Sequence, residues 1–373
     1  MVSIARRNMF REKGRFAVTA IGIAASIMLI LFGVGMAVGI WGSMVTVVDH
    51  SKADIWVLNS QNVDLAQGES ILPESMLTQI QAINSVKSIS SLIYSPSIAE
   101  KAGAKQTVEI VGVDTPSGLV LPWSMVSGSI SSLNTNNSVI IDECAQMGLG
   151  KLSVGDKIII NNSSEQVVGI CSGAKTFFYP FVFTSNQNAQ KLCNINGNET
   201  NYILVSVQQP QDVAQVAKQI SQMGGVNALP NSEVRANTVN YMLYKSGIGA
   251  MVGVFAGVGL FVAVTIVSLT IYTTTMERIP EYGTLKALGA AKRDIYKILI
   301  EQAFWPATIG FLGGLGLSLA ATLLITSFTI MPIEITVQLI VAVYALTVLL
   351  SVLGSFLSIR KVNKIDPAIV FRA

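Results

Sequence analysis

The sequence predicts an α-helical membrane protein with four transmembrane helices and a large α+β extracytoplasmic domain inserted between helices one and two. Of its 373 residues, 51% are hydrophobic and only 13% are charged, about half the charged fraction of ordinary soluble proteins. Four apolar runs without a charged residue or histidine are each long enough to cross about 30 Å of hydrocarbon. This composition excludes a cytosolic enzyme, a nucleic-acid-binding protein and an outer-membrane barrel.

The four runs divide the chain into segments. Transmembrane helices are predicted at 16–41, 247–272, 304–328 and 337–359; between them lie a basic entry segment (1–15), the extracytoplasmic domain with its stalk ends (42–246), a coupling loop (273–303), an external turn (329–336) and a tail (360–373). Entry segment, loop and tail hold 14 of the 25 Lys and Arg residues. Because basic residues near helix ends stay in the cytoplasm, we expect a multi-pass protein of the inner (cytoplasmic) membrane with both termini cytoplasmic. The first run is too long for a signal peptide and is expected to remain.

The external segment reads as a mixed domain. Short β-rich runs bounded by Gly, Pro, Asn or Ser predict strands at 53–58, 108–113, 138–141, 157–160, 166–170, 181–184 and 202–207. Apolar residues at helical spacing predict helices at 73–83 and 212–223, and the polar stretch 161–165 predicts a hairpin turn. Apolar residues continue past Trp41 and precede Gly247. Helices one and two are therefore expected to run on into the domain as continuous stalks.

The predicted cytoplasmic loop contains a short amphipathic segment. Ile279, Tyr282, Leu285 and Leu288 recur at helical spacing among charged residues. A solvated loop is the simpler interpretation, but exposed loops seldom hold such periodic apolar residues. We therefore interpret this segment as a docking helix for a cytoplasmic partner.

Several motifs resemble those of the MacB/FtsX-like permeases of ABC transporters, the type VII or mechanotransmission family. Residues 276–290, MERIPEYGTLKALGA, resemble the family signature after the second membrane helix. The basic start (5–15), the ending KVNKIDPA (361–368) and the stretches 148–158 and 167–170 are similar to further family motifs. The string YPFVFT (179–184) resembles the DevC-like or haem-exporter-like branch.

This resemblance implies a permease subunit of an exporter that is driven by a separate cytoplasmic ABC ATPase, with ATP and Mg²⁺ held by that partner. The chain itself is expected to be neither an enzyme nor a cofactor-binding protein, since its nearest approach to a phosphate-binding GxxxxGK[ST] loop has Leu152 after Gly150 and Lys151. The family implies a homodimer, in some members with a membrane-fusion adaptor. An amphiphilic or hydrophobic substrate such as haem, a lipid-like molecule, a peptide or a drug would be expelled by movement of the external domains. The predicted ATPase-coupling residues are Glu277, Arg278, Glu281, Tyr282, Gly283, Leu285, Leu288 and Gly289.

Glycines four residues apart predict close helix contacts, because small residues let helix backbones approach in lipid. Helix three contains Gly310 and Gly314 at this spacing. The resemblance to the family implies that helices one and two form the dimer interface, where glycines lie at this spacing: Gly35, Gly39, Gly249, Gly253 and Gly257. General enrichment of glycine in membrane helices remains the alternative explanation.

A substrate groove is predicted where helices one and two leave the membrane. Methionine and aromatic side chains there suit an apolar, planar or acyl ligand: Met36, Trp41, Met44, Tyr241, Met242, Tyr244 and Met251. An aromatic belt at the membrane surface, in contact with lipid, is the alternative.

No catalytic residue and no metal site are predicted. The single histidine, His50, follows Asp49 at the stalk and is expected to face solvent; Cys144, Cys171 and Cys193 allow at most one disulfide. The membrane runs hold no ionisable residue, which argues against a proton-coupled transporter. Two other functions stay open, a transmembrane regulator of an extracytoplasmic cell-wall hydrolase and a sensor that signals inward.

Overall fold

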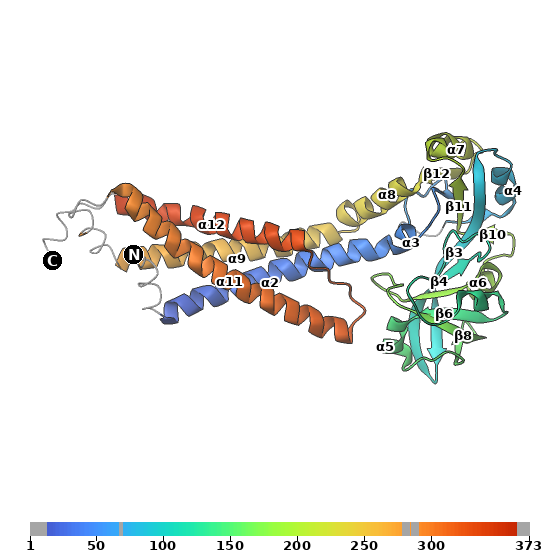
Figure 1. The fold of residues 1–373 in the computed structure, drawn as a ribbon, viewed down its shortest axis with the longest axis horizontal. Helices are drawn as coiled ribbons and strands as arrows, with labels where there is room; N and C mark the ends of the chain where they lie inside the picture. Colours follow the sequence, from blue (N-terminus) through green and yellow to red (C-terminus); the bar gives the residue numbers. More distant parts are fainter. Residues whose placement is uncertain (1–12, 67–69, 278–283, 285–290, 364–373) are drawn as a thin grey trace. The chain divides into compact units, whose positions relative to one another are not determined.

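The computed structural model describes residues 13–66, 70–277, 284 and 291–363 (Figure 1). The chain forms two compact units. The first, here called the membrane unit, comprises Met1–Val38, Ala250–Ser327 and Ile333–Ala373. The second, here called the external unit, comprises Gly39–Gly249 and Phe328–Pro332.

The membrane unit is built from four long helices: α2 (Lys13–Met44), α9 (Ile248–Glu277), α11 (Lys292–Phe328) and α12 (Val337–Asn363). Within the described residues, Phe16–Met44, Ile248–Ile266 and Tyr296–Phe328 are long and apolar enough to cross a membrane, and Val337–Leu353 is a shorter apolar helix. Several helix boundaries differ from the sequence prediction. Helix α2 continues to Met44, and α11 begins at Lys292 rather than 304, because its charged first turns are helical as well and only the apolar composition starts at 304.

Helix α2 supplies most of the core of the membrane unit. Ile23, Ile27 and Leu31 are almost fully buried, and they pack with Ala303 and Phe311 of α11 and with Val343 of α12. Leu260 of α9 closes the cluster. Side chains on the opposite face of α2, such as Ile21 and Leu29, are exposed, as expected of residues that face lipid. Figure 1 shows α9, α11 and α12 beside α2.

A ten-stranded sheet forms the frame of the external unit, in the order β12-β1-β11-β3-β4-β9-β6-β8-β5, with β7 pairing both β3 and β8. Its strands are β1 (Ile55–Asn59), β3 (Val86–Lys101), β4 (Ala104–Val113), β5 (Met125–Gly128), β6 (Ser138–Asp142), β7 (Lys157–Ile160), β8 (Ser163–Cys171), β9 (Phe181–Ser185), β11 (Tyr202–Val207) and β12 (Val226–Pro230). Two short strands, β2 (Leu72–Pro73) and β10 (Glu199–Thr200), form a second sheet.

Part of the large sheet closes on itself. The pairs β3-β4, β4-β9, β9-β6, β6-β8, β8-β7 and β7-β3 form a ring. Inward-facing side chains of these strands make one buried cluster that includes Ile110, Ile141, Ile158, Val167 and Val182, as expected of a small barrel whose interior is filled by side chains. Helices α5 (Gln146–Leu149) and α6 (Asn186–Leu192) contribute Leu149 and Leu192 to the same core.

The other part of the sheet, with β1, β11 and β12, is covered on one face by α4 (Ser75–Gln81) and α7 (Val213–Ser221), which bury Ile80 and Ile220 there. Alternation along β1 sends Ile55 and Val57 to this face and Trp56 and Leu58 to the opposite face. That opposite face packs against the outer face of the barrel, and the side chains between them form a third buried cluster. This third cluster joins the two parts of the external unit.

The structure confirms every strand predicted in this region and both helices, with ends shifted by a few residues. The predicted hairpin between β7 and β8 is tighter than expected, since Ile160 pairs with Ser163 across a two-residue turn. Asn161 and Asn162 both have positive φ in that turn, as a type I′ turn requires. The sequence analysis missed the long strand β3, together with β5, β12 and α6.

Candidate functional site: the membrane bundle and the stalk

Small residues bring the helices of the membrane unit into close contact with α2. A Cβ atom added at Gly314 of α11 would lie 2.7 Å from the Ala24 carbonyl oxygen, and one at Gly310 would lie 2.7 Å from Ile23. The glycine pair predicted on helix three therefore serves contact within the chain. Helix α9 meets α2 in the same way, through Gly22 against Ile266 and Gly259 against Ile30.

The glycines predicted for the dimer interface fall into two groups. Gly35 packs against residues 333–335 within the membrane unit, and Gly39 packs against Pro332 within the external unit. A Cβ atom on Gly249 would lie 1.9 Å from the Leu243 carbonyl oxygen. Gly253 and Gly257 have nothing within 4 Å of the position of an added Cβ. A Cβ atom added at either position would therefore meet no described residue of this chain.

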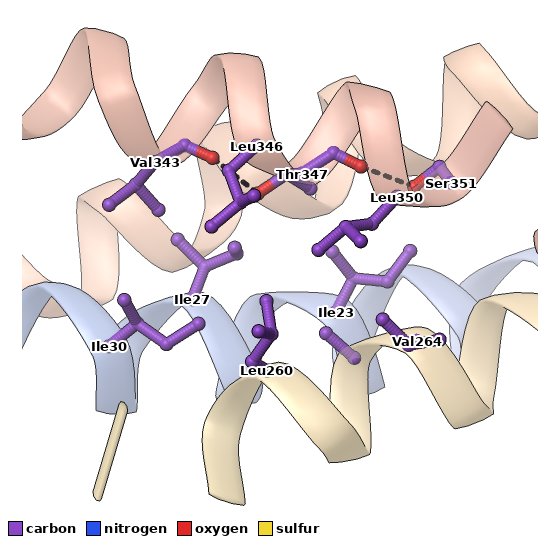
Figure 2. Close-up of a pocket in the computed structure, with 11 residues that line it drawn as sticks. Ile23, Ile27, Ile30, Leu260, Val264, Val343, Leu346, Thr347, Leu350 and Ser351 are labelled. Atoms are coloured by element: carbon purple, nitrogen blue, oxygen red, sulfur yellow. Dashed lines mark hydrogen bonds between the residues drawn. The ribbon is translucent and has the colours of Figure 1, made fainter. Parts of the chain in front are cut away.

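Helices α2, α9 and α12 enclose a small apolar cavity in the membrane unit (Figure 2). Its volume of about 10 Å³ leaves room for no more than a single water molecule. Two hydroxyls line it, but Thr347 donates to the Val343 carbonyl at 2.7 Å and Ser351 to the Thr347 carbonyl at 2.7 Å. Both bonds stay within α12, so the cavity offers little to hold a polar ligand.

The residues of the predicted groove differ in their surroundings. Met242 is buried, Met36, Trp41, Met44 and Tyr241 are half-buried, and Tyr244 and Met251 are exposed. Met36 and Met251 belong to the membrane unit and the other five to the external unit. The substrate groove stays a prediction.

Two segments of the external unit, far apart in sequence, are tied together where the chain enters it and leaves it. Arg235 of α8 (Asn231–Tyr244) forms an ion pair of 2.8 Å with Asp49 at the end of α3 (Thr46–Asp49). The Asn231 side-chain amide donates to the carbonyl oxygens of Val48 at 3.2 Å and Ala53 at 3.1 Å. We call these contacts the stalk clamp. The sequence analysis missed it, since the partners are almost the whole domain apart in sequence.

The second stalk is not continuous with its membrane helix, contrary to the sequence prediction. Helix α8 ends at Tyr244, and α9 begins at Ile248. Between them the Lys245 and Ser246 N–H groups both donate to the Tyr241 carbonyl, and Gly247 has a φ of +82°. A residue in this conformation ends a helix. The apolar pattern runs through the break because the side chains before it pack in the external unit.

An aromatic stack joins the first stalk to the barrel. The His50 ring, just after α3, lies parallel to the Trp123 ring with centroids 3.9 Å apart. Trp123 in turn meets Phe181 at 6.0 Å and Phe183 at 5.4 Å, both edge to face. His50 is exposed as predicted, but one face of its ring is covered. Val45, Val47 and Val48 enter the same core, so the end of the first stalk is part of the fold of the external unit.

The cysteines and nearby acids show no catalytic arrangement. No disulfide joins Cys144, Cys171 and Cys193. Burial, with the nearby Asp142 charge, raises the pKa of the Cys144 thiol to about 11. Burial also raises the pKa of Asp142, although the backbone N–H groups of Cys144 and Ala174 donate to its carboxylate. In the described part of the chain no group of three His, Cys, Asp or Glu side chains is placed to hold a metal ion.

Most residues predicted to couple the chain to an ATPase lie outside the described residues: Arg278, Glu281, Tyr282, Gly283, Leu285, Leu288 and Gly289. Glu277 is described and is the exposed last residue of α9. The coupling site therefore stays a prediction.

Comparison with known proteins matches two family descriptions to this chain. Residues 16–223 match the MacB-like periplasmic core domain, and residues 253–367 match the FtsX-like permease C-terminal region. The chain is 24% identical, over its full length and 99% of the relative, to an uncharacterized ABC transporter permease of Mycobacterium tuberculosis. It is 22% identical to the putative hemin transport system permease protein HrtB of Staphylococcus haemolyticus, covering 91% of this chain and 90% of HrtB.

Two further similarities cover only part of one of the two proteins compared. The pyoverdine export ATP-binding/permease protein PvdT of Pseudomonas putida is 21% identical over 97% of this chain, which spans 58% of PvdT. The periplasmic region of MacB from Actinobacillus actinomycetemcomitans superposes with a TM-score of 0.38 at 11% identity, over 52% of this chain and 96% of that region. The matches to both family descriptions, one over more than half of the chain, show that this protein belongs to the MacB/FtsX-like family of ABC transporter permeases.

Proposed function

We propose that this chain is the permease subunit of an ABC exporter that works with a separate ATPase, which binds the ATP and Mg²⁺. In this proposal four helices span the inner membrane with both termini in the cytoplasm, and two copies of the chain form the transporter. ATP hydrolysis moves the helices, and the helices move the external units. The observation that carries the proposal is the stalk clamp, because it ties the entering and leaving segments of the external unit into one folded body.

The open face of α9 supports the homodimer. Contacts of α9 with α2 use Gly259, while a Cβ atom added at Gly253 or Gly257 would have no described atom within 4 Å. Val254, Val258 and Phe261 on the same face are exposed. Small residues flanked by large apolar ones permit close packing of two helices in lipid. A second α9 is therefore the proposed partner of this face.

We further propose that the substrate is amphiphilic or hydrophobic and leaves from the outer side of the membrane near Tyr244 and Met251. These two predicted groove residues are exposed on the external and membrane units. Two relatives are named for hemin transport and for pyoverdine export. We therefore propose a substrate of moderate size rather than a small ion. A membrane-fusion adaptor would then be needed only where a second membrane must be crossed.

The test is reconstitution with the cognate ATPase in lipid nanodiscs. The double variant Glu281→Ala, Leu285→Arg should lose at least tenfold in ATPase pull-down and in permease-stimulated ATP hydrolysis, because a charge would replace an apolar docking residue. Ile159→Arg makes the same kind of change at an exposed apolar side chain of the external unit and should leave both unchanged. Equal pull-down for wild type and double variant would refute the proposed coupling site, and an absence of ATPase binding by the wild type would refute the function.

A further inference from the structure

Residues 175–180 form a tight hairpin tip in the external unit, which we call the aromatic tip. Lys175 and Pro180 pair across its base. The Thr176 backbone N–H donates to the Tyr179 carbonyl at 2.8 Å. The Thr176 hydroxyl oxygen accepts from the N–H groups of Phe178 at 3.2 Å and Tyr179 at 2.9 Å. One threonine therefore holds the whole turn in a defined shape.

The tip presents three consecutive aromatic side chains. Phe178 is 53% exposed, and Phe177 and Tyr179 are half-buried. The Phe177 and Phe178 rings meet edge to face with centroids 4.7 Å apart, and Tyr179 lies 5.8 Å from Phe178. A single exposed apolar residue is ordinary, but a fixed turn that displays a cluster of aromatic rings indicates a surface for an apolar partner.

The base of the aromatic tip is connected by ring contacts to the segment where the stalk enters the external unit. Phe181 follows the tip directly, and its ring is 6.0 Å from Trp123, which stacks on His50 at 3.9 Å. His50 comes one residue after α3, and only Val45 separates α3 from the end of α2. Two ring contacts thus join the base of the tip to the segment through which the chain arrives from its first membrane helix.

We propose that the aromatic tip docks onto the surface of the lipid bilayer, with Phe178 and its neighbours in the headgroup region. Aromatic rings are favoured at that depth, where the ring is partly in hydrocarbon and a polar tip such as the Tyr179 hydroxyl stays wet. The single cation, Lys175, lies close enough to Asp142 to interact with its charge. The contact with the bilayer would then come from the aromatic rings and not from attraction between Lys175 and anionic lipid. A bilayer of zwitterionic lipid should therefore be sufficient for docking. This inference does not depend on the ATPase or on the substrate.

The test uses the full chain in bilayers of phosphatidylcholine that contain a phospholipid with a photoreactive diazirine near its glycerol. After illumination, peptide mass spectrometry locates the lipid adducts. Adducts are expected on residues 175–180, and Phe178→Ser should lower their yield at least fivefold. Ile98 is the matched control, since it is an exposed apolar side chain of the same unit with a similar exposed fraction, 54%. Its peptide should carry no adduct, and Ile98→Ser should leave the yield on the tip unchanged.

Four results would overturn the inference. The first is an absence of adducts on the tip, or equal yields on the tip and around Ile98. The second is an unchanged yield in Phe178→Ser, because the label would then report proximity without docking. The third is protection of the tip from a water-soluble carbene reagent without lipid adducts, which would show that a protein surface, such as a second copy of the chain, covers it. A yield that required phosphatidylglycerol would also exclude the proposed aromatic mode of contact.

Discussion

The contact between α11 and α2 predicts opposite effects for one substitution at two neighbouring glycines. Gly314 faces α2, where an added Cβ atom would lie 2.7 Å from the Ala24 carbonyl oxygen and 2.7 Å from the Ile27 Cβ. Gly316 lies two residues on in the same helix, with nothing within 4 Å of an added Cβ. Gly314→Ala and Gly316→Ala are therefore a matched pair in which only the contact differs.

The sizes of the two effects follow from the geometry. A Cβ closer than 3.0 Å to a backbone oxygen forces the helices apart, and overpacking of this kind costs about 1–3 kcal/mol. At Gly316 the alanine stabilises the helix by about 0.5–1 kcal/mol, since glycine loses more backbone entropy in a helix. Gly314→Ala receives the same helical gain but loses more to the clash. We expect the free energies of unfolding of the two variants to differ by about 2 kcal/mol.

The assay is reversible unfolding of the purified chain in mixed micelles with increasing sodium dodecyl sulfate, followed by tryptophan fluorescence. Trp305 in α11 reports on the membrane unit. The midpoint of Gly314→Ala should fall below that of the wild type and that of Gly316→Ala should equal or exceed it. If Gly314→Ala is as stable as Gly316→Ala, the close approach of α11 to α2 does not exist and the described bundle is wrong at that point.

Three other predictions concern different parts of the molecule. Gly253→Leu should weaken a homodimer by about fivefold or more, because close packing of this kind contributes about 1 kcal/mol or more in membranes; native mass spectrometry showing unchanged dimer in both Gly253→Leu and Gly257→Leu would exclude this face. Asn231→Ala removes two hydrogen bonds of the stalk clamp and should destabilise the external unit by about 1–3 kcal/mol, whereas Asn237→Ala removes one exposed bond to Val63 and should cost less; equal shifts in thermal unfolding would contradict the clamp. With its pKa raised to about 11, Cys144 holds little thiolate at pH 8, so its alkylation, followed by mass spectrometry, should be slow and should accelerate up to about pH 11, while a rate that levels off by pH 9 would show that the thiol is not buried as described.

Local patterns were sufficient to predict much of the fold. The charge-free runs identified the apolar parts of all four long helices, because a membrane helix satisfies its own backbone and needs only length and apolar side chains. The strands β7 and β11 were predicted with their observed bounds, since each is a β-rich run between turn residues. The hairpin between β7 and β8 was predicted from the polar stretch 161–165, and in the structure Asn161 and Asn162 adopt the positive φ of its tight turn.

Strand β3 escaped prediction for a physical reason. Ser90, Ser91, Ser95, Ser97 and Pro96 give its middle the composition of a loop. The strand forms because it pairs with β11 along its first half and with β4 and β7 along its second half. Of these partners, β7 and β11 are distant in sequence, and a β-strand takes its stability from such pairing rather than from local propensity.

The stalk contains one feature that has no local sequence signal and one whose signal was outweighed by another pattern. No local signal connects Asp49 with Arg235, since the two are 186 residues apart, and only the folded domain brings them together. The break before α9 did have a signal, because Gly247 after Lys245 and Ser246 fits the usual C-terminal end of a helix. The continuous apolar pattern on both sides outweighed it in the sequence analysis. The ATPase-coupling residues, apart from Glu277, lie outside the described residues and rest on the family motif.

The first stalk is continuous with its long helix and the second is not. In the proposed mechanism this difference changes the route by which movement would reach the external unit. The sequence analysis predicted two continuous stalks. A helix that ends at Tyr244 and restarts at Ile248 can instead bend at Gly247, and part of any displacement of α9 would be lost there. Helix α2 is unbroken from Lys13 to Met44 and meets α9 through Gly22 and Gly259. Displacement of α9 would pass sideways to α2 and then along it, because packed helices move together when their contacts are close. The valines after α2 are buried in the core of the external unit, so the first stalk cannot move without that core. In this scheme the clamp between Asp49 and Arg235 keeps α8 in step with α2, and the break at Gly247 lets α8 follow the external unit while α9 follows the membrane bundle.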